Sequence, residues 1–492
     1  MIEPVITPLF INGTARSAET GALYDIVNPA RPSELVGQSA EASLSDCTDA
    51  IAAAKGAFKS WSRLSIQERA AYLSQVAEGL NADKDEMHAR IELFVREHGK
   101  VRFEATLEIE RLADRFRQVA GFAARVDAEE QIAGPRFDTI VARHARGVTT
   151  LIVPWNWPLA ILGSKLPQAL LAGNTVVIKL SEFASLAPAL SIIKIAEMLP
   201  PGVVNLITGD GVRLGPTLIE HKDVRQVNFT GSIPVGTMVM QSAAKNITPV
   251  TLELGGNDAG IILDDIDLTD ETFQKLSMGA FMTTGQICMA LKRLYVHRSV
   301  FDDVISGLSA KLQNQVIGDG LLDGTTMGPM NNMRQMKRVE ALTEDAKASG
   351  ADIQYFGTVP DQDLFDTGYF LRPSLVVNAN PDLAVVKEEQ FGPILPIIPF
   401  DTEDEALALA NDSDYGLNSS IWSSDIERAE SLAREVEAGF THINAHGPSA
   451  MDGLSPFGGV KQSGVGRNFG YEGILQFQEY HAISGPSGSL IS

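Results

Sequence analysis

Residues 175–179 read TVVIK, a short run of β-branched residues that ends in a lysine. Helix-like segments such as residues 185–199 separate this run from others of the same kind. These are VTTLIV (148–153), VVNLI (203–207), VRQVNF (224–229) and AGIIL (259–263). Apolar strands joined by helical crossovers indicate a parallel sheet covered on both faces. Ligands of such sheets bind at the carboxyl ends of the strands, so we expect the chemistry in the loops after these runs.

The pattern resumes beyond about residue 290. The later runs are RLYVH (293–297), LVVNA (375–379), ILPIIPF (394–400) and SSIWSS (419–424). They predict a second α/β unit. A chain of 492 residues is also too long for one ordinary core, which favours two or three domains.

Composition excludes several classes of partner. The chain has 62 Asp plus Glu against 40 Lys plus Arg, a net charge of -22, which disfavours binding to nucleic acid or to an anionic membrane. No apolar run approaches the ~18 residues of a membrane span. The N-terminal sequence MIEPVITPLF does not resemble a secretory signal. We therefore predict a cytoplasmic protein that acts on a small molecule.

The two cysteines are far apart in the chain. Cys47 and Cys288 suggest neither a disulfide framework nor a zinc cluster, as expected in a reducing compartment. Cys47 lies on the apolar stripe of a predicted helix, where free cysteine commonly packs as a small hydrophobe. His442 and His446 are four apart, but THINAHGP is typical of strand and loop, so we predict no metal site.

Two stretches are candidates for nucleotide binding. ITGDGVRLG carries Gly209, Gly211 and Gly215, whose last spacing departs from the usual dinucleotide fingerprint. In NFTGSIPVG, Gly231 and Ser232 precede a predicted helix and could offer amides and a hydroxyl to a pyrophosphate. A simple helix cap explains the same two residues equally well.

TVVIK leads into two charged groups, Lys179 and Glu182. A carboxylate there could bind the hydroxyls of an adenosine ribose and repel a 2′-phosphate, which favours NAD over NADP. The alternative is a surface ion pair.

Cys288, in GQICMALKR, has small neighbours but no adjacent base, so locally it is only one candidate nucleophile. Glu253 lies within the apolar run VTLELGGN, where burial would raise its pKa toward that of a general base. Pairing with a buried Arg or Lys is the alternative for Glu253. Polar groups also stand among aromatic and proline residues in LIVPWNWP, with Asn156, and in VKEEQFGP, with Glu389.

Taken together, these segments resemble the aldehyde dehydrogenase superfamily over nearly the whole chain. The matching motifs, in the family's order, are PWNWP (154–158), FTGS (229–232), LELGGN (252–257), GQIC (285–288), EEQFGP (388–393) and PFGGVKQSGVGR (456–467). The resemblance implies that Cys288 is the nucleophile, Glu253 the general base and Asn156 an oxyanion donor. Its implied cofactor-binding residues are Trp155, Lys179, Glu182, Gly209, Gly231, Ser232, Leu254, Glu389 and Phe391.

The resemblance also implies an architecture and an activity. Residues 1–122 and 146–254 would form a Rossmann-like NAD-binding domain, and 255–474 a second α/β catalytic domain. Residues 123–145 and 475–492 would be oligomerisation segments of a homodimer or homotetramer. The implied reaction is oxidation of an aldehyde to the free acid with NAD, or alternatively NADP, as hydride acceptor.

This sequence departs from the family pattern at two positions. Leu180 replaces the proline that often follows the lysine of the ribose site, which leaves the rigidity of that loop open. Asn468 follows Arg467 where many relatives have a second glutamate, so we assign no second base.

For the aldehyde, we expect a pocket lined by Trp157, Ile161, Ile287, Met289 and the segment 442–454. These residues are mainly apolar or aromatic, and no Arg or Lys stands out among them. They favour an aromatic or medium-chain aliphatic aldehyde. The alternatives are a semialdehyde dehydrogenase and a catalytically silent binding or structural protein on the same fold.

Overall fold

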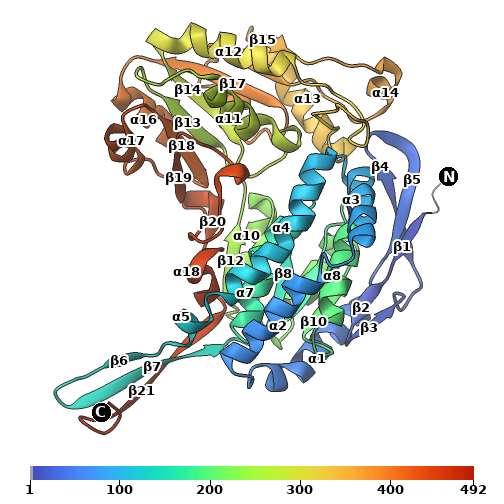
Figure 1. Ribbon diagram of the computed structural model, residues 1–492, viewed down its shortest axis with the longest axis vertical. Coiled ribbons are helices and arrows are strands. Elements are labelled where there is room, and N and C mark those ends of the chain that lie inside the picture. Colours follow the sequence, from blue (N-terminus) through green and yellow to red (C-terminus); the bar gives the residue numbers. More distant parts are fainter. Residues whose placement is uncertain (1–3, 492) are drawn as a thin grey trace.

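Two large sheets, each covered on both faces by helices, make up most of the molecule, and a narrow arm projects from it (Figure 1). This computed structural model describes residues 4–491. No helix within that range is long and apolar enough to cross a membrane.

The first sheet has eight strands, of which the five in the middle run parallel. In spatial order they are β20 (Gly464–Val465), β12 (Val250–Glu253), β11 (Val224–Thr230), β8 (Val148–Ile152), β9 (Thr175–Lys179), β10 (Val204–Ile207), β2 (Leu9–Ile11) and β3 (Thr14–Arg16). The alternation of side chains along a strand divides the core in two. In β9, Val176 and Ile178 pack into one apolar cluster and Val177 into the other.

Helices cover both faces of this sheet. Those that pack into the first cluster are α2 (Ile66–Gly79), α3 (Lys84–His98), α4 (Arg102–Ala120), α6 (Pro158–Gly163), α7 (Leu166–Leu171) and α8 (Ala187–Glu197). Those that pack into the second are α1 (Leu44–Trp61), α9 (Gly211–Glu220) and α10 (Ile233–Ala244). Cys47 is fully buried on α1, as its place on the apolar stripe predicts.

The second sheet has seven strands, parallel except for the edge strand β15. In spatial order they are β15 (Asp352–Tyr355), β16 (Ser374–Val377), β17 (Ile394–Phe400), β14 (Leu291–His297), β13 (Asp258–Ile262), β18 (Asn418–Trp422) and β19 (Phe440–Ile443). Its two covering layers are α11 (Asp270–Phe281), α12 (Phe301–Gln313) and α14 (Gln362–Thr367) on one side, and α13 (Met333–Ala348), α15 (Ala384–Lys387), α16 (Glu403–Asn411) and α17 (Ile426–Ala433) on the other.

The arm is a three-stranded antiparallel sheet in which the C-terminal strand pairs with a hairpin from the middle of the chain (Figure 1). Its strands are β6 (Glu130–Ile132), β7 (Phe137–Ala145) and β21 (Gln478–Pro486), and helix α5 (Ala123–Asp127) leads into it. A second small sheet is formed by β1 (Val5–Thr7), β5 (Arg31–Ala40) and β4 (Leu23–Asn28).

The predicted α/β class is confirmed, because parallel strands occupy each of the runs named above. Near its end the chain returns to the first sheet. Strand β20 pairs with β12, and α18 (Gly470–Leu475) packs against α7 and α5. Residues 464–475 therefore lie beside the first sheet and not the second.

Candidate active site

A cleft of about 890 Å³ runs along the carboxyl ends of β8, β9, β11 and β12. Its other wall comes from the second unit, through α13, the segment 389–391 and Tyr415. Trp155, Asn156 and Cys288 lie together along the lining. The cleft therefore lies at the carboxyl ends of the strands, where parallel sheets of this kind bind their ligands.

Lys179 and Glu182 line the same cleft, close to α9. Lys179 is buried at the end of β9, and its Nζ lies 3.3 Å from a carboxylate oxygen of the half-exposed Glu182. Both the predicted ribose site and the alternative ion pair are therefore compatible with the geometry, and the pair faces the cleft.

Gly231 and Ser232 lie at the start of α10, and both line the cleft. Ser232 is the N-cap residue of this helix, but its hydroxyl makes no capping hydrogen bond. Ser232 therefore occupies the helix-cap position without a side-chain capping bond, and its hydroxyl is available to a ligand at the positive end of the helix.

The glycines of ITGDGVRLG divide between two roles. Gly211 and Gly215 line the cleft, but Gly209 is not among its lining residues. Gly209 instead has a φ of 125° in the turn before α9. This backbone conformation favours glycine, so it accounts for the residue at position 209 without any contact to a ligand.

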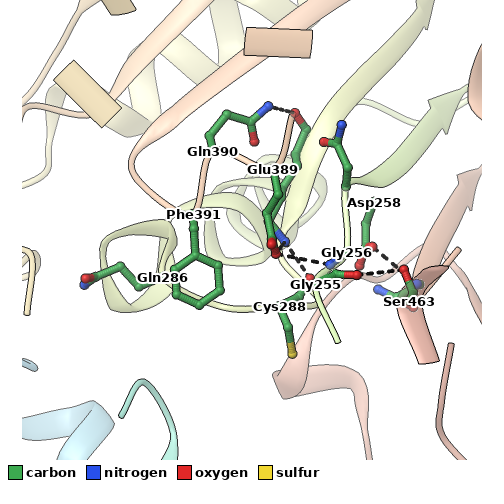
Figure 2. Close-up of polar contacts among 12 residues, drawn as sticks. Gly255, Gly256, Asp258, Gln286, Cys288, Glu389, Gln390, Phe391 and Ser463 are labelled. Carbon is green, nitrogen blue, oxygen red and sulfur yellow. Dashed lines mark hydrogen bonds and ion pairs between the residues drawn. The ribbon is translucent and has the colours of Figure 1, made fainter. Parts of the chain in front are cut away.

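Glu389 lines the other side of the cleft and is half-buried, with its carboxylate beside Gly255 and Gly256 (Figure 2). Its Oε1 accepts a hydrogen bond of 3.1 Å from the Gly256 amide and lies 3.5 Å from Lys292 Nζ. A Cβ on Gly255 would come within 2.3 Å of the second carboxylate oxygen. Glycine at position 255 therefore lets the carboxylate lie against the chain after β12.

Aromatic rings flank Glu389. Phe391 has a left-handed backbone with a φ of 53°. Its ring meets that of Trp155 edge to face, with 5.6 Å between the centroids. Both rings line the cleft, and so does Leu254, whose amide is held by the Ser463 carbonyl at 2.8 Å.

The loop that carries Cys288 has an unusual backbone. Thr283, Thr284 and Gly285 have successive φ values of 52°, 57° and 72° in the turn η1 (Met282–Gly285). β-Branched residues adopt this region at a cost of about 1–3 kcal/mol each, so neighbours must hold them there. Glu104 of α4 accepts the Thr283 amide, and the Thr284 hydroxyl donates to the Gly328 carbonyl at 2.9 Å.

The two thiols have similar electrostatics but different surroundings. Burial raises the pKa of Cys288 to about 12, with Lys292 opposing the shift, and burial also raises the pKa of Cys47 to about 12. Cys47 is sealed in the core, whereas Cys288 lines the cleft. Position, and not pKa, therefore distinguishes Cys288, and its thiol needs a base before it can attack.

Asn156 lies beside the Cys288 loop. It follows β8, is buried, and donates one amide hydrogen to the Gln286 carbonyl at 2.9 Å. A side-chain amide has two N–H groups, so a second donor remains at this position.

Glu253 ends β12 and is buried. Burial raises its pKa to about 8, opposed by Lys165 and Arg467. Within residues 4–491 neither carboxylate oxygen has a hydrogen-bond partner, so the predicted alternative of a closely paired carboxylate is wrong. Its charge is close enough to raise the pKa of the Cys288 thiol.

Lys165 belongs to a buried polar chain beside these groups. Its ammonium donates to Asn228, whose amide donates to Asn468 at 3.1 Å. Burial lowers the pKa of Lys165 to about 8, and Glu253 and Cys288 act in the opposite sense. An asparagine therefore receives this hydrogen bond where many relatives have a second glutamate.

The four residues predicted to meet the aldehyde lie in one apolar cluster around the Cys288 side chain. Trp157, Ile161, Ile287 and Met289 all belong to it. Its other members are Leu107, Ala160, Met282, Ala290, Leu417, Phe440, Met451, Phe457 and Phe469. We refer to this set as the Cys288 apolar cluster.

Lys292 is the main site residue that sequence reasoning missed. Its ammonium donates to the Cys288 carbonyl and lies beside Glu389, although its side chain is almost fully buried. A signal was present: a lysine in the apolar strand LKRLYVH, four residues after the cysteine, is costly to bury without a partner.

A cleft of this size at the carboxyl ends of parallel strands, with a thiol in its wall, is the arrangement of an enzyme that binds a nucleotide cofactor and forms a covalent intermediate. A family model described as "Aldehyde dehydrogenase family" matches residues 15–483. The chain belongs to the aldehyde dehydrogenase family and is an NAD-dependent aldehyde dehydrogenase.

Its similar relatives include dehydrogenases of several aldehydes. The chloroplastic betaine aldehyde dehydrogenase of Beta vulgaris is 37% identical over 95% of this chain and 94% of the relative. Lactaldehyde dehydrogenase of Escherichia coli is 34% identical, covering 98% and 99% of the two chains. Aminoaldehyde dehydrogenase 1 of Pisum sativum is 35% identical, covering 95% and 93%.

Among solved structures, betaine aldehyde dehydrogenase from Staphylococcus aureus in complex with NAD+ matches with a TM-score of 0.91 and 32% identity, covering 99% of this chain and 95% of the other. The residues present here fit such a dinucleotide. Ser232 has an uncommitted hydroxyl at a helix N-terminus, and Gly255 leaves the space in which the Glu389 carboxylate lies.

Proposed function

We propose that this enzyme oxidises a short polar aldehyde to its carboxylic acid, with Cys288 as nucleophile, Glu253 as general base and Asn156 as oxyanion donor. The observation that carries the proposal is the placement of these three groups: a thiol in the cleft wall, an unpaired buried carboxylate near it, and an amide at its loop.

The first step needs a proton acceptor, because burial keeps the Cys288 thiol protonated near neutral pH. Glu253 accepts that proton, and the thiolate attacks the aldehyde carbon. The carbonyl oxygen becomes an anion in the tetrahedral thiohemiacetal. The second N–H of Asn156 stabilises this charge, and losing one such donor typically costs about 3 kcal/mol in barrier height.

Bound NAD supplies the acceptor for the hydride that leaves the adduct carbon. The carbonyl re-forms as this hydride leaves, so Cys288 then carries a thioester. Lys179, Glu182 and Glu389 would hold the cofactor, and the rings of Trp155 and Phe391 would shield the reacting end from water.

Glu253 first releases the Cys288 proton to solvent and then takes a proton from water, whose oxygen attacks the thioester. The tetrahedral adduct expels the Cys288 thiolate as the acid forms, and the proton held by Glu253 restores the thiol. A carboxylate at this position favours hydrolysis over transfer of the acyl group to a thiol. Its buried setting also matches a base that must be half-ionised near the working pH.

The substrate proposal departs from the expectation based on sequence. The relatives named above act on betaine aldehyde, lactaldehyde and aminoaldehydes, none of which is an aromatic or medium-chain aliphatic aldehyde. Their names do not support that expectation. They favour a short aldehyde with a polar group, the class that includes aminoaldehydes.

The division into domains also stands as a proposal. We propose a cofactor domain of residues 1–122 and 146–254 and a catalytic domain of 255–474, whose last residues return to the first sheet. Residues 123–145 and 475–492 would join subunits of a cytoplasmic homodimer or homotetramer. Exposed Ile132, Phe137 and Tyr480 on the arm support this role.

The two cysteines provide a matched test of the nucleophile. Cys288→Ala should abolish aldehyde-dependent NADH formation and retain NAD binding, measured by fluorescence titration. Cys47→Ala removes an equally perturbed thiol from the core and should retain the wild-type kcat. Undiminished turnover of Cys288→Ala would overturn the assignment.

A further inference from the structure

One face of α4 borders the Cys288 apolar cluster. Leu107 packs in that cluster, and Arg111 and Arg115 follow at four and eight residues. Residues at this spacing lie on the same side of a helix, about 6 Å apart per step. The arginines therefore continue the wall that Leu107 begins.

Arg115 is in direct contact with the cluster. Its guanidinium carbon lies 5.0 Å from the centre of the Phe469 ring, and Phe469 is a member of the cluster. One nitrogen, Nη1, donates both to the Asp452 carbonyl and to Gln118 Oε1, the latter at 2.7 Å. These bonds fix the guanidinium plane at the end of the cluster.

The positive charge of this pair is not neutralised by contact. Within residues 4–491 no carboxylate lies within 4 Å of a guanidinium nitrogen of Arg111 or Arg115. The nearby acids are committed elsewhere: Asp114 pairs with Arg117 at 2.5 Å, and Asp452 Oδ1 accepts the Leu454 amide at 2.8 Å.

Burial lowers the pKa of Arg115 and the adjacent Arg111 lowers it further, while the carboxylates of Asp452 and Asp114 oppose the shift without contacting the guanidinium. Two like charges held side by side destabilise the protein unless an anion joins them. The arrangement therefore favours an anionic ligand at this end of the cluster.

The path of the substrate leads to this pair. Hydride must leave toward the cofactor cleft, so the carbon chain of an aldehyde bound to Cys288 must extend to the opposite side of the sulfur. Cys288 is itself a partly buried member of the Cys288 apolar cluster, as are Leu107, Met451 and Phe469. Because Arg115 contacts Phe469, the cluster connects the thiol with the guanidinium group, and a substrate chain that follows the cluster would approach the two arginines.

We propose that Arg111 and Arg115 bind a carboxylate at the far end of the aldehyde, so that the preferred substrate is a short acidic semialdehyde. This inference rests on the proposed function, because it concerns the aldehyde that Cys288 attacks. It separates this enzyme from relatives named for betaine aldehyde or aminoaldehydes, whose substrates carry a cationic group.

Three four-carbon aldehydes test the assignment: succinic semialdehyde, butanal and 4-aminobutanal. For the wild type we expect kcat/KM to fall in that order. A charge-assisted hydrogen bond to a carboxylate corresponds to a preference of roughly 10- to 100-fold over the neutral aldehyde. Equal rates, or faster oxidation of 4-aminobutanal, would overturn the inference.

Variants separate recognition from a structural role. Arg111→Gln and Arg115→Gln should raise KM for succinic semialdehyde about tenfold or more and leave kcat for butanal within about twofold. Arg111→Glu should move the preference toward 4-aminobutanal. Arg102→Gln is the matched control, because Arg102 is an exposed arginine of the same helix whose ion pair with Glu92 lies away from the cluster.

The outcomes distinguish the two proposals. If the Gln variants slow all three aldehydes equally, the arginines do not recognise the substrate, and the assignment is overturned while the proposed reaction stands. If Arg115→Gln does not fold, Arg115→Lys keeps the charge and should retain the preference for the acid. No NADH formation by the wild type with any aldehyde would instead overturn the proposed reaction.

Discussion

Two buried glutamates show how local contacts decide the role of a side chain. Burial raises the pKa of both Glu97 and Glu253 to about 8. The Glu97 oxygens accept amides of Leu186 and Ala187 at 2.8 and 2.7 Å and so hold the start of α8. Those of Glu253 have no such partner within residues 4–491. Of the two, only Glu253 has carboxylate oxygens left without a hydrogen-bond partner in this part of the chain.

Glu253→Gln should therefore trap the acyl-enzyme. We expect at most one slowed burst of NADH per site, then turnover reduced by about 100-fold or more, because the amide can accept a proton neither from Cys288 nor from water. In the wild type, hydrolysis should rise with pH through about 8, since the ionised carboxylate is the active form. Stopped-flow absorbance and intact mass measure both effects.

The control for this experiment is Glu97→Gln. This variant should lower the melting temperature without accumulating an acyl adduct, because Glu97 binds a helix end and not the substrate. Normal steady-state turnover of Glu253→Gln, with no adduct in the mass spectrum, would refute the role of Glu253 as base.

At the scale of elements, the turn after β12 depends on the lack of a side chain at Gly255, which leaves room for the Glu389 carboxylate. In Gly255→Ala the added methyl would meet Glu389 Oε2 at 2.3 Å and displace the carboxylate. We expect KM for NAD to rise about tenfold or more, since charge-assisted bonds to the cofactor would be lost. Steady-state kinetics at saturating aldehyde measure this.

Gly56→Ala is the matched substitution in an open position. Gly56 lies on the exposed side of α1, and nothing lies within 4 Å of its added methyl. Alanine there should stabilise the protein by about 0.5–1 kcal/mol and leave KM unchanged. An unchanged KM in Gly255→Ala as well would show that Glu389 does not hold the cofactor.

The strands were predictable because their signal is local. TVVIK became β9 without a change of bounds, and its alternating valines divide between two cores, as a sheet covered on both faces requires. In the structure, Ser65 and Glu68 form a capping box at the start of α2, another signal that is local in the sequence. Such patterns extend over only a few residues.

Contacts between distant segments were not predictable in this way. Arg115 meets Phe469 and Asp452, more than three hundred residues further along the chain. On sequence alone Arg115 is an ordinary charged residue of a helix, so its contact with the Cys288 apolar cluster could not be expected. The position of Lys292 at the site was missed for a related reason, because its partner Glu389 is distant in the sequence.

At the scale of the whole molecule, the arm suggests a prediction about how subunits associate. Its strands expose large apolar side chains, among them Tyr480, which is 64% exposed. If the arm joins subunits, Tyr480→Asp should reduce the mass of the assembly, because burying a charge at an interface is costly. Light scattering after size-exclusion chromatography measures this mass.

Ile247→Asp tests whether any loss of an exposed apolar group has the same effect. Ile247 is 89% exposed and lies away from the arm, in the turn after α10. It should leave the mass unchanged. A mass unaffected by Tyr480→Asp would assign the arm another role.

The position of Cys288 between two differently built walls has an evolutionary consequence. The cofactor wall comes from strand ends and from Glu389, whereas the opposite wall comes from α4 and from residues 451–469. Mutations in the second wall can change which aldehydes the enzyme oxidises without disturbing the binding of NAD. Relatives that share one cofactor chemistry can therefore differ in the aldehydes they oxidise. Helix α4 is one element in which substitutions would produce such differences.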